Sequence, residues 1–466
     1  MKSGINRNRR LVRVTKRCLS SRRECVRDLG SKDGELRVFI VAGEVSGDII
    51  ASRFMNSLKR ISPFPVRFAG VGGLTMSQQG LDSLFPMEDI AVMGIWELLP
   101  HLSMFRVRLK ETVESACTFR PHVVLTVDSK GFSFRFLKQL RAIYGQHRVD
   151  SPRHFHYVAP SFWAWRGGEA RLKGLSQFVD HVFCILPFEA QVCRSNGLGA
   201  TFVGHPTLED VLHLKINKFI DEDWKVQGDG EEFRKNYGIS SGSSIISVLP
   251  GSRLQEVRRM LSIFSQTMEL LKEAFPKLTT AIHVAPNKHV EEYISKAVCE
   301  WPVSVVLVPG GSPCMKYNSF SASRVALCTS GSVAVELQLA RLPCVVAYRA
   351  HILTEWFIRY KAKIPYISLP NILLDSPIIP EALFGACIPS RLASLLMDLI
   401  RDEGFRQKQI CAAEKFLNSL SPPKRVVLSF LFLSFATCSH FLSPFSTAYL
   451  SYLLIQNLVE RIKIII

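Results

Sequence analysis

Two short stretches in the second half of the chain combine residue types that suit a nucleotide. The first is Pro250-Gly251-Ser252-Arg253, which follows an apolar, β-branched run and precedes a helical pattern. Its glycine lets a ligand approach the backbone, the helix start offers free N–H groups, and the arginine adds a permanent, forked charge. Together these features fit a diphosphate. The alternative is a helix start with a surface arginine.

The second stretch, Thr329–Glu336, repeats this arrangement after another apolar run. Ser330 and Gly331 form the turn, Ser332 can cap the following helix, and Glu336 lies one helical turn further on the same face. A carboxylate in that place can accept both hydroxyls of a ribose. Neither stretch continues as Gly-Lys-Ser/Thr, the signature of a P-loop, so a kinase or ATPase is disfavoured.

A third turn lies in the first half of the chain, where the apolar run that begins at Arg37 stops at Gly43. Its polar and small residues are Glu44, Ser46, Gly47 and Asp48. Three polar side chains are more than a tight turn requires, and a helix N-terminus there suits an anion or a polar ligand. An ordinary strand-to-helix turn is the other interpretation.

Strand-like runs alternate with helical patterns along the chain and predict parallel sheets. The expected fold class is α/β, with two tandem Rossmann-like, doubly wound domains that face a cleft. About six strands place the first domain at residues 36–206, and a second series places the other at 243–385. A polar stretch at 207–242 is the expected linker, and helices are expected at 386–420. The carboxyl ends of the strands, and with them the turns above, should face the ligand crevice.

The two ends of the 466-residue chain differ in composition from the middle, and the net charge is +18. Residues 1–34 hold eleven Lys/Arg and three acidic residues, which leaves 47 basic and 37 acidic residues elsewhere. This start predicts a mitochondrial transit peptide, with a disordered basic tail as the alternative. Residues 421–466 form a hydrophobic tail without formal charge from Val426 to Val459. A membrane anchor, a sticky helix and a non-native terminus from alternative splicing are its three interpretations, and the last is favoured.

Twelve scattered cysteines include no Cys-x-x-Cys pair, which indicates reduced core thiols and no zinc site. No acidic cluster has the spacing of metal ligands. Ser161 and Trp163 lie in a loop after an apolar run, where two tryptophans either fill the core or wall a ligand.

An apolar and basic segment at residues 93–110 predicts either a buried helix or a surface that touches a membrane or an acyl chain. The residues expected at such a contact are Trp96, Leu98, Leu99, Leu102, Phe105, Arg106 and Arg108.

Eight motifs occur along the chain in an order that carries a resemblance. They lie at residues 42–48, 91–97, 157–165, 186–189, 202–206, 249–253, 330–336 and 366–371, and include Ala-Gly-Glu-Val-Ser-Gly-Asp at the first and Tyr-Ile-Ser-Leu-Pro-Asn at the last. Over about residues 36–420 the chain resembles the lipid-A-disaccharide synthases, a family of inverting glycosyltransferases, in an organellar version.

The resemblance implies a GT-B type fold and an enzyme that needs no metal and no cofactor. It implies transfer of 2,3-diacylglucosamine from UDP-2,3-diacylglucosamine to the 6-hydroxyl of 2,3-diacylglucosamine 1-phosphate (lipid X). The products would be a β-1,6-linked tetraacyl disaccharide 1-phosphate, an intermediate of lipid A biosynthesis, and UDP. A membrane surface, met peripherally, is then an expected partner, and nucleic acid is not.

The resemblance assigns residues to each substrate. The second domain would hold the UDP-sugar through Pro250, Gly251, Ser252, Arg253, Ser330, Gly331, Ser332, Glu336 and Asn371. The first domain would hold the lipid acceptor near Ser46, Gly47, Asp48, Ser161 and Trp163.

An inverting transfer needs a group that takes the proton of the acceptor hydroxyl. Asp128 is the favoured base because it ends the strand Val123–Val127 at the ligand crevice, and Glu44 is its rival. Alternatively, Asp128 caps the turn from Ser129 to Gly131.

The sequence departs from the family pattern in two places. After Asp128 the family usually continues Ala-Pro-Asp-Phe-Asn, but residues 129–133 read Ser-Lys-Gly-Phe-Ser, so a second carboxylate is absent. Family members also end in an amphipathic helix that packs back or joins a partner chain in a homodimer, whereas this chain turns hydrophobic at 421. The alternatives are another UDP-sugar enzyme of the same fold, such as an epimerase, or an inactive, membrane-associated nucleotide-sugar binder.

Overall fold

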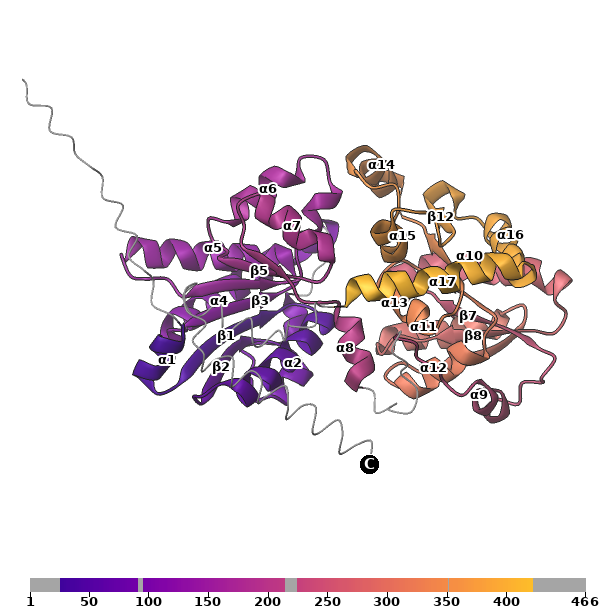
Figure 1. The fold of residues 1–466 in the computed structure, drawn as a ribbon, viewed down its shortest axis with the longest axis horizontal. Coiled ribbons are helices and arrows are strands. Elements are labelled where there is room, and N and C mark those ends of the chain that lie inside the picture. Colours follow the sequence, from indigo (N-terminus) through magenta and orange to yellow (C-terminus); the bar gives the residue numbers. More distant parts are fainter. Residues whose placement is uncertain (1–25, 91–94, 214–223, 351, 422–466) are drawn as a thin grey trace, which may run out of the picture.

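The computed structural model describes residues 26–90, 95–213, 224–350 and 352–421, and these form two lobes with a sheet in each (Figure 1). In the first lobe the order along the chain is α1 (Val26–Asp33), β1 (Leu36–Ala42), α2 (Val45–Ile61), β2 (Val66–Val71), α3 (Leu74–Ser77), α4 (Ile95–Phe119), β3 (Val123–Val127), α5 (Lys130–Gln146), β4 (Arg153–Tyr157), α6 (Gly168–Leu175), β5 (His181–Cys184), α7 (Pro187–Ser195) and β6 (Ala200–Phe202). Short 3₁₀ helices lie at Met87–Asp89 and Ser161–Ala164.

The second lobe follows the same alternation. Its elements are α8 (Pro206–His213), α9 (Gly230–Asn236), β7 (Ser244–Leu249), α10 (Leu254–Ala274), β8 (Leu278–His283), α11 (Lys288–Ala297), β9 (Ser304–Val308), α12 (Pro313–Ala322), β10 (Val325–Cys328), α13 (Val333–Leu339), β11 (Cys344–Tyr348), α14 (Ile352–Lys361), α15 (Leu369–Leu374), β12 (Glu381–Leu383), α16 (Pro389–Arg401) and α17 (Glu403–Leu420).

Each sheet is parallel, six-stranded and buried on both faces. Along β1, Phe39 and Val41 point into one core with α4 and α5, whereas Val38 and Ile40 point into another with α2. Side chains alternate across a strand, so a strand covered on both faces must be apolar at successive positions. The prediction of two doubly wound α/β domains is therefore confirmed.

The strand order of each sheet reverses at one place. The orders are β2-β1-β3-β4-β5-β6 in the first sheet and β12-β11-β10-β7-β8-β9 in the second. In the first sheet the chain passes from β1 to β2 and then crosses to β3 on the other side of β1, and in the second it passes from β7 through β8 to β9 and then crosses to β10 on the other side of β7. In open α/β sheets a crevice forms at such a point, beyond the carboxyl ends of the strands.

The expected linker at 207–242 contains helices, and part of it packs on the second domain. The backbone N–H of Asp229, which begins α9, donates to Asn318 Oδ1 on α12 at 2.7 Å, and Gly228 N donates to Ser321 Oγ at 2.8 Å. At the other end of the second domain, α17 returns to the junction, where His205 N donates to Leu420 O at 3.2 Å. The second domain thus includes α9, ahead of the boundary expected at 243.

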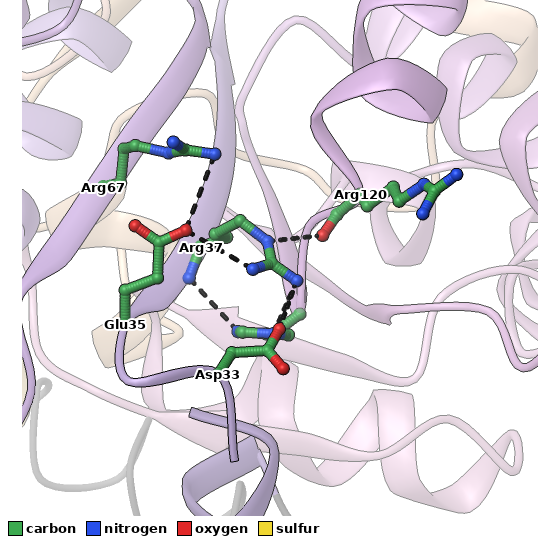
Figure 2. Close-up of polar contacts among 6 residues, drawn as sticks. Asp33, Glu35, Arg37, Arg67 and Arg120 are labelled. Atoms are coloured by element: carbon green, nitrogen blue, oxygen red, sulfur yellow. Dashed lines mark hydrogen bonds and ion pairs between the residues drawn. The ribbon is translucent and has the colours of Figure 1, made fainter. Parts of the chain in front are cut away.

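Residues 26–33 form α1, although the sequence places them in a transit peptide. Asp33 at the end of α1 pairs with Arg37 on β1 and with His122 Nε2 at 3.0 Å, while Glu35 pairs with Arg37 and Arg67 (Figure 2). These contacts hold α1 against the first sheet at the amino ends of its strands. The tail at 422–466 lies outside the described residues. Within the described parts of the chain, no helix is both long and apolar enough to cross a membrane.

Candidate active site

The turns after β1 and β3 touch at the reversal point of the first sheet. A Cβ added at Gly43 would lie 2.5 Å from Ser129 Oγ, so only glycine lets the two turns meet. Asp128 and Ser129 both have a left-handed backbone, with φ of 50° and 42°. Glu44 and Asp128, the two residues predicted as candidate bases, therefore come from neighbouring strand ends.

The electrostatic environment of these carboxyl groups favours their protonated forms. Burial, followed by the charge of Asp128, raises the pKa of half-buried Glu44 to about 7, against the opposing effects of Arg253 and Lys130. Burial also raises the pKa of Asp128, while the backbone N–H of Ser129 and the same two cations oppose the rise. A carboxyl that titrates near neutral pH can accept a proton from a substrate under physiological conditions.

Arg253 brings the second domain to this site. It is exposed at the first turn of α10, after β7, and its positive charge acts on both Glu44 and Asp128. The charge of Arg253 therefore links the reversal point of the second sheet to the two carboxyls at the reversal point of the first.

The turn that carries Arg253 is fixed by Glu256, a residue that the sequence analysis did not single out. Gly251 has φ +114°, and a Cβ there would overlap the Glu256 carboxylate. Glu256 bonds the backbone of Ser252 and the hydroxyl of Thr329, which joins the turns after β7 and β10. Its position three residues into the helix from Arg253 is the place of a capping carboxylate, and that spacing is a signal that could have revealed it.

The turn after β10 differs from expectation at Ser332. This residue is helical, with φ −59° and ψ −25°, and its side chain makes no capping hydrogen bond. Ser330 Oγ donates instead to Ile367 O at 3.2 Å, and Gly331 takes φ +140°. The turn is therefore shaped by its glycine and by Ser330, and capping by Ser332 is wrong.

Glu336 has a cationic partner inside the second domain. Lys316 Nζ on α12 donates to Glu336 Oε1 at 2.8 Å, and both side chains are largely buried. The lysine holds one carboxylate oxygen in place beside the turn. A ribose would have to share this carboxylate with Lys316.

Asn371, expected at the UDP-sugar, is engaged within the fold. It is fully buried, its amide donates to Ile379 O and Glu381 Oε1 at 2.8 Å each, and its carbonyl accepts from Ile379 N at 2.9 Å. Glu381 also accepts from Ser368 Oγ at 2.6 Å. Asn371 therefore holds the segment before β12 in place, and its role at the UDP-sugar stays a prediction.

Asp48, expected near the acceptor, is likewise satisfied by the protein itself. Its buried carboxylate accepts from the backbone of Gly73 (2.8 Å), Thr75 (2.9 Å) and Met76 (3.1 Å), and from Thr75 Oγ1 (2.6 Å). It thereby caps α3 and fixes the start of α2 against it. Gly47 packs close to β3, while Ser46 stays exposed beside Glu44.

The tryptophan loop packs against the start of α7. Trp163 Nε1 donates to Glu189 Oε1 at 3.0 Å. The Trp163 ring packs edge-on against the Phe188 ring, with the two ring centroids 4.6 Å apart. Burial raises the pKa of Glu189 to about 7. Trp163 is thus half-buried and held in one orientation, while Ser161 at the start of the loop is exposed.

Two residues expected at a membrane or an acyl chain are used within the fold. Phe105 on α4 is buried, with its ring 5.2 Å from Phe132 on α5, and Arg108 pairs with Asp89 at 2.7 Å and Glu111 at 2.8 Å. Phe105 is therefore not available at the surface, whereas Arg108 is partly exposed with its charge paired, and its assignment to such a contact stays a prediction. Arg106 is exposed and Leu102 half-buried. The side chains of Trp96, Leu98 and Leu99 lie outside the described residues.

The cysteines match the expectation from the sequence. The nine cysteines that the structure describes are free, and five of them are buried, as reduced core thiols would be. In the described ranges, no group of three or more His, Cys, Asp or Glu side chains could hold a metal ion.

Comparison with known proteins identifies the relatives of the chain. The model of the family described as lipid-A-disaccharide synthetase matches residues 38–428. A protein of Arabidopsis thaliana named "Probable lipid-A-disaccharide synthase, mitochondrial" is 64% identical over 397 residues, which cover 85% of this chain and 86% of the relative. The lipid-A-disaccharide synthase of Rhodospirillum centenum is 40% identical over 375 residues, or 80% of this chain and 88% of the relative.

Solved structures share the fold at much lower identity. The crystal structure of UDP-GlcNAc 2-epimerase from Neisseria meningitidis bound to UDP-GlcNAc superposes with a TM-score of 0.53 at 12% identity. It covers 82% of this chain and 98% of that protein. Likeness at this identity supports the two-domain architecture.

Replacing Glu44 by glutamine should stabilise the protein at alkaline pH. The folded carboxyl, with a pKa of about 7, keeps a proton that the unfolded chain loses near its ordinary value of 4.5. The free energy of unfolding therefore falls as the pH rises from about 4.5 to about 7. Glutamine cannot ionise, so Glu44→Gln should raise the free energy of unfolding at pH 8 by on the order of 1–2 kcal/mol. This gain is smaller than the gain expected at a fully buried carboxyl.

Urea unfolding of Glu44→Gln and of the unsubstituted chain at pH 5 and pH 8 measures this effect. The exposed Glu231→Gln on α9 is the matched control and should change neither value. An equal gain for Glu44→Gln at both pH values would contradict the raised pKa.

Proposed function

The chain belongs to the lipid-A-disaccharide synthetase family, and from this premise we propose its reaction in detail. It transfers 2,3-diacylglucosamine from UDP-2,3-diacylglucosamine to the 6-hydroxyl of lipid X, with inversion at the anomeric carbon and without a metal ion. The observation that carries this proposal is the pair Glu44 and Asp128 at adjoining strand ends, with the charge of Arg253 from the second domain acting on both. Such a site places a proton acceptor opposite a cation for a diphosphate.

The transfer is a single displacement. The 6-oxygen of the acceptor attacks the anomeric carbon of the donor, and the bond from that carbon to the diphosphate oxygen breaks with its electron pair on UDP. Arg253 and the N–H groups at the start of α10 stabilise the charge that develops on the diphosphate. Glu336, positioned by its ion pair with Lys316, accepts hydrogen bonds from the ribose hydroxyls. The proton of the acceptor hydroxyl passes to a carboxylate of the first domain.

Glu44 is better suited than Asp128 to take that proton. Burial and then the charge of Asp128 raise the pKa of Glu44 to about 7, so Glu44 titrates near neutral pH. A base is most effective when its pKa lies near the working pH. Asp128, which the sequence favours as the base, then strengthens Glu44 by its negative charge. Two coupled carboxyls titrate as a pair, so the assignment describes which of them holds the last proton.

The alternative enzyme functions have weaker support. The fold likeness to a UDP-GlcNAc 2-epimerase is at 12% identity, whereas the relatives with 64% and 40% identity are named as disaccharide synthases. An inactive binder would not require a carboxyl with a pKa of about 7 opposite Arg253.

Location and membrane contact are parts of the same proposal. A relative with 64% identity is named mitochondrial, and the basic start of the chain supports import into mitochondria. Because α1 is fastened to the sheet, the removable part would end before Val26. Failure of residues 1–25 to carry a fluorescent protein into mitochondria would contradict this location. Acylated substrates place the enzyme peripherally at a membrane.

A transfer assay on the purified chain tests the function. With radiolabelled UDP-2,3-diacylglucosamine and lipid X, we expect a labelled β-1,6-linked tetraacyl disaccharide 1-phosphate and UDP, formed equally well in EDTA. Arg253→Ala should reduce the rate. An epimerised UDP-sugar without disaccharide would indicate the alternative enzyme, and UDP-sugar binding without any product would indicate the inactive binder.

Binding of UDP measured by calorimetry tests the roles of the second domain. Arg253→Ala should weaken binding by about 1.5–3 kcal/mol, the range for a hydrogen bond to a charged group. Glu336→Ala should weaken it as well, because the ribose loses its acceptor. Arg258→Ala, one turn further along α10 and 5.5 Å from the Tyr293 ring, is the matched control and should leave affinity unchanged. Unchanged affinity in both Arg253→Ala and Glu336→Ala would exclude this UDP site.

A further inference from the structure

Two aromatic rings lie exposed on α14, outside the site described above. Trp356 is 68% and Tyr360 58% exposed, and their rings stack with centroids 5.9 Å apart and planes within 6°. Residues four apart share one face of a helix, so the two rings form a single apolar patch. Large apolar groups gathered in one place on a surface mark a contact with something else.

Cations accompany the rings. Lys361 Nζ lies 5.2 Å from the centre of the Tyr360 ring. Arg359 is 62% exposed, pairs with Glu355 at 2.9 Å, and lies 5.7 Å from the Phe384 ring. Tryptophan and tyrosine beside lysine and arginine are the combination that settles at the boundary between lipid headgroups and acyl chains.

The end of α14 is joined to the first domain at the mouth of the cleft. Lys361 O accepts from Arg166 N at 2.8 Å, and Lys363 N donates to Ala164 O at 2.9 Å. Lys363 Nζ pairs with Glu169 on α6 at 2.8 Å. In Figure 1, α6 and α14 lie at the same edge of the molecule, on either side of the space between the lobes. The edge therefore spans both domains.

The charge of this edge is strongly positive. We call residues 164–175 and 352–363 the α6–α14 edge. Its basic residues are Arg166, Arg171, Lys173, Arg359, Lys361 and Lys363, and its acidic residues are Glu169 and Glu355. Near an anionic bilayer each added cation strengthens the electrostatic attraction. The charge and the rings thus complement the same kind of surface.

We propose that the α6–α14 edge docks on an anionic lipid bilayer, with Trp356 and Tyr360 entering the headgroup region. The purpose of this contact rests on the proposed function, since both substrates carry acyl chains that could reach the cleft without leaving the bilayer. On α4, Phe105 packs against Phe132 and Arg108 pairs with Asp89, so these two residues of the segment predicted to touch a membrane have partners within the protein.

Hydrogen–deuterium exchange on the full chain localises the contact. Vesicles of phosphatidylglycerol and phosphatidylcholine should slow amide exchange in residues 352–361 roughly tenfold, whereas pure phosphatidylcholine or high salt should abolish the effect. Protection only at 95–119, or only at 422–466, would overturn the proposal. Slow exchange at 352–361 before vesicles are added would also overturn it, since a second copy or the chain's own tail would then cover the rings.

Paired substitutions test the rings directly. Trp356→Ser with Tyr360→Ser should raise the dissociation constant for anionic vesicles roughly tenfold or more and remove the protection at 352–361. Tyr237→Ser, at an aromatic residue 37% exposed beside α9, is the matched control and should leave both unchanged. Unchanged UDP affinity in the double variant confirms that it is folded.

Vesicle binding is measured without turnover, so it fails or succeeds independently of the proposed reaction. Transfer between short-chain, soluble substrates in the same double variant should be normal. Loss of vesicle binding together with normal soluble transfer supports the edge. Vesicle binding that survives the double substitution overturns it, whatever the enzyme transfers.

Discussion

The contact between the turns after β1 and β3 is the constraint on which the site depends. Gly43 lies against Ser129 with no room for a Cβ, and this brings Glu44 and Asp128 together at the reversal point of the first sheet. Burial of Glu44, followed by the charge of Asp128, raises the pKa of Glu44 to about 7, so this carboxyl holds its proton up to near neutral pH. The local backbone thus creates the proton acceptor.

The second domain supplies the opposite charge through the same kind of geometry. The strand order of its sheet also reverses at β7, the strand that ends at the turn carrying Arg253. Glu256 joins this turn to the turn after β10 and so fixes the position of Arg253. Each domain alone would hold half of a site. The junctions at His205 with Leu420, and at Arg166 with Lys361, keep the two halves facing each other.

Local sequence patterns predicted the elements well, and distant partners explain where they failed. Apolar runs that end in glycine or a carboxylate predicted both the strands and the turns at the candidate site. This was possible because the apolar run and the residue that ends it lie within a few positions of each other in the sequence. The pattern could not separate Glu44, which faces the cleft, from Asp48, whose partners at Gly73–Met76 lie about 25 residues away. The internal hydrogen bonds of Asn371 could not be predicted for the same reason, since its partner Glu381 lies on a later strand.

The pH dependence of kcat/KM in the unsubstituted chain and in Asp128→Asn tests the account most directly. We expect kcat/KM to rise with pH through an inflection near 7, because Glu44 must lose its proton to act as base. In Asp128→Asn the inflection should move to lower pH, since the neighbouring negative charge is gone. An inflection that stays in place in Asp128→Asn, or its absence between pH 5 and 9 in the unsubstituted chain, would contradict the account.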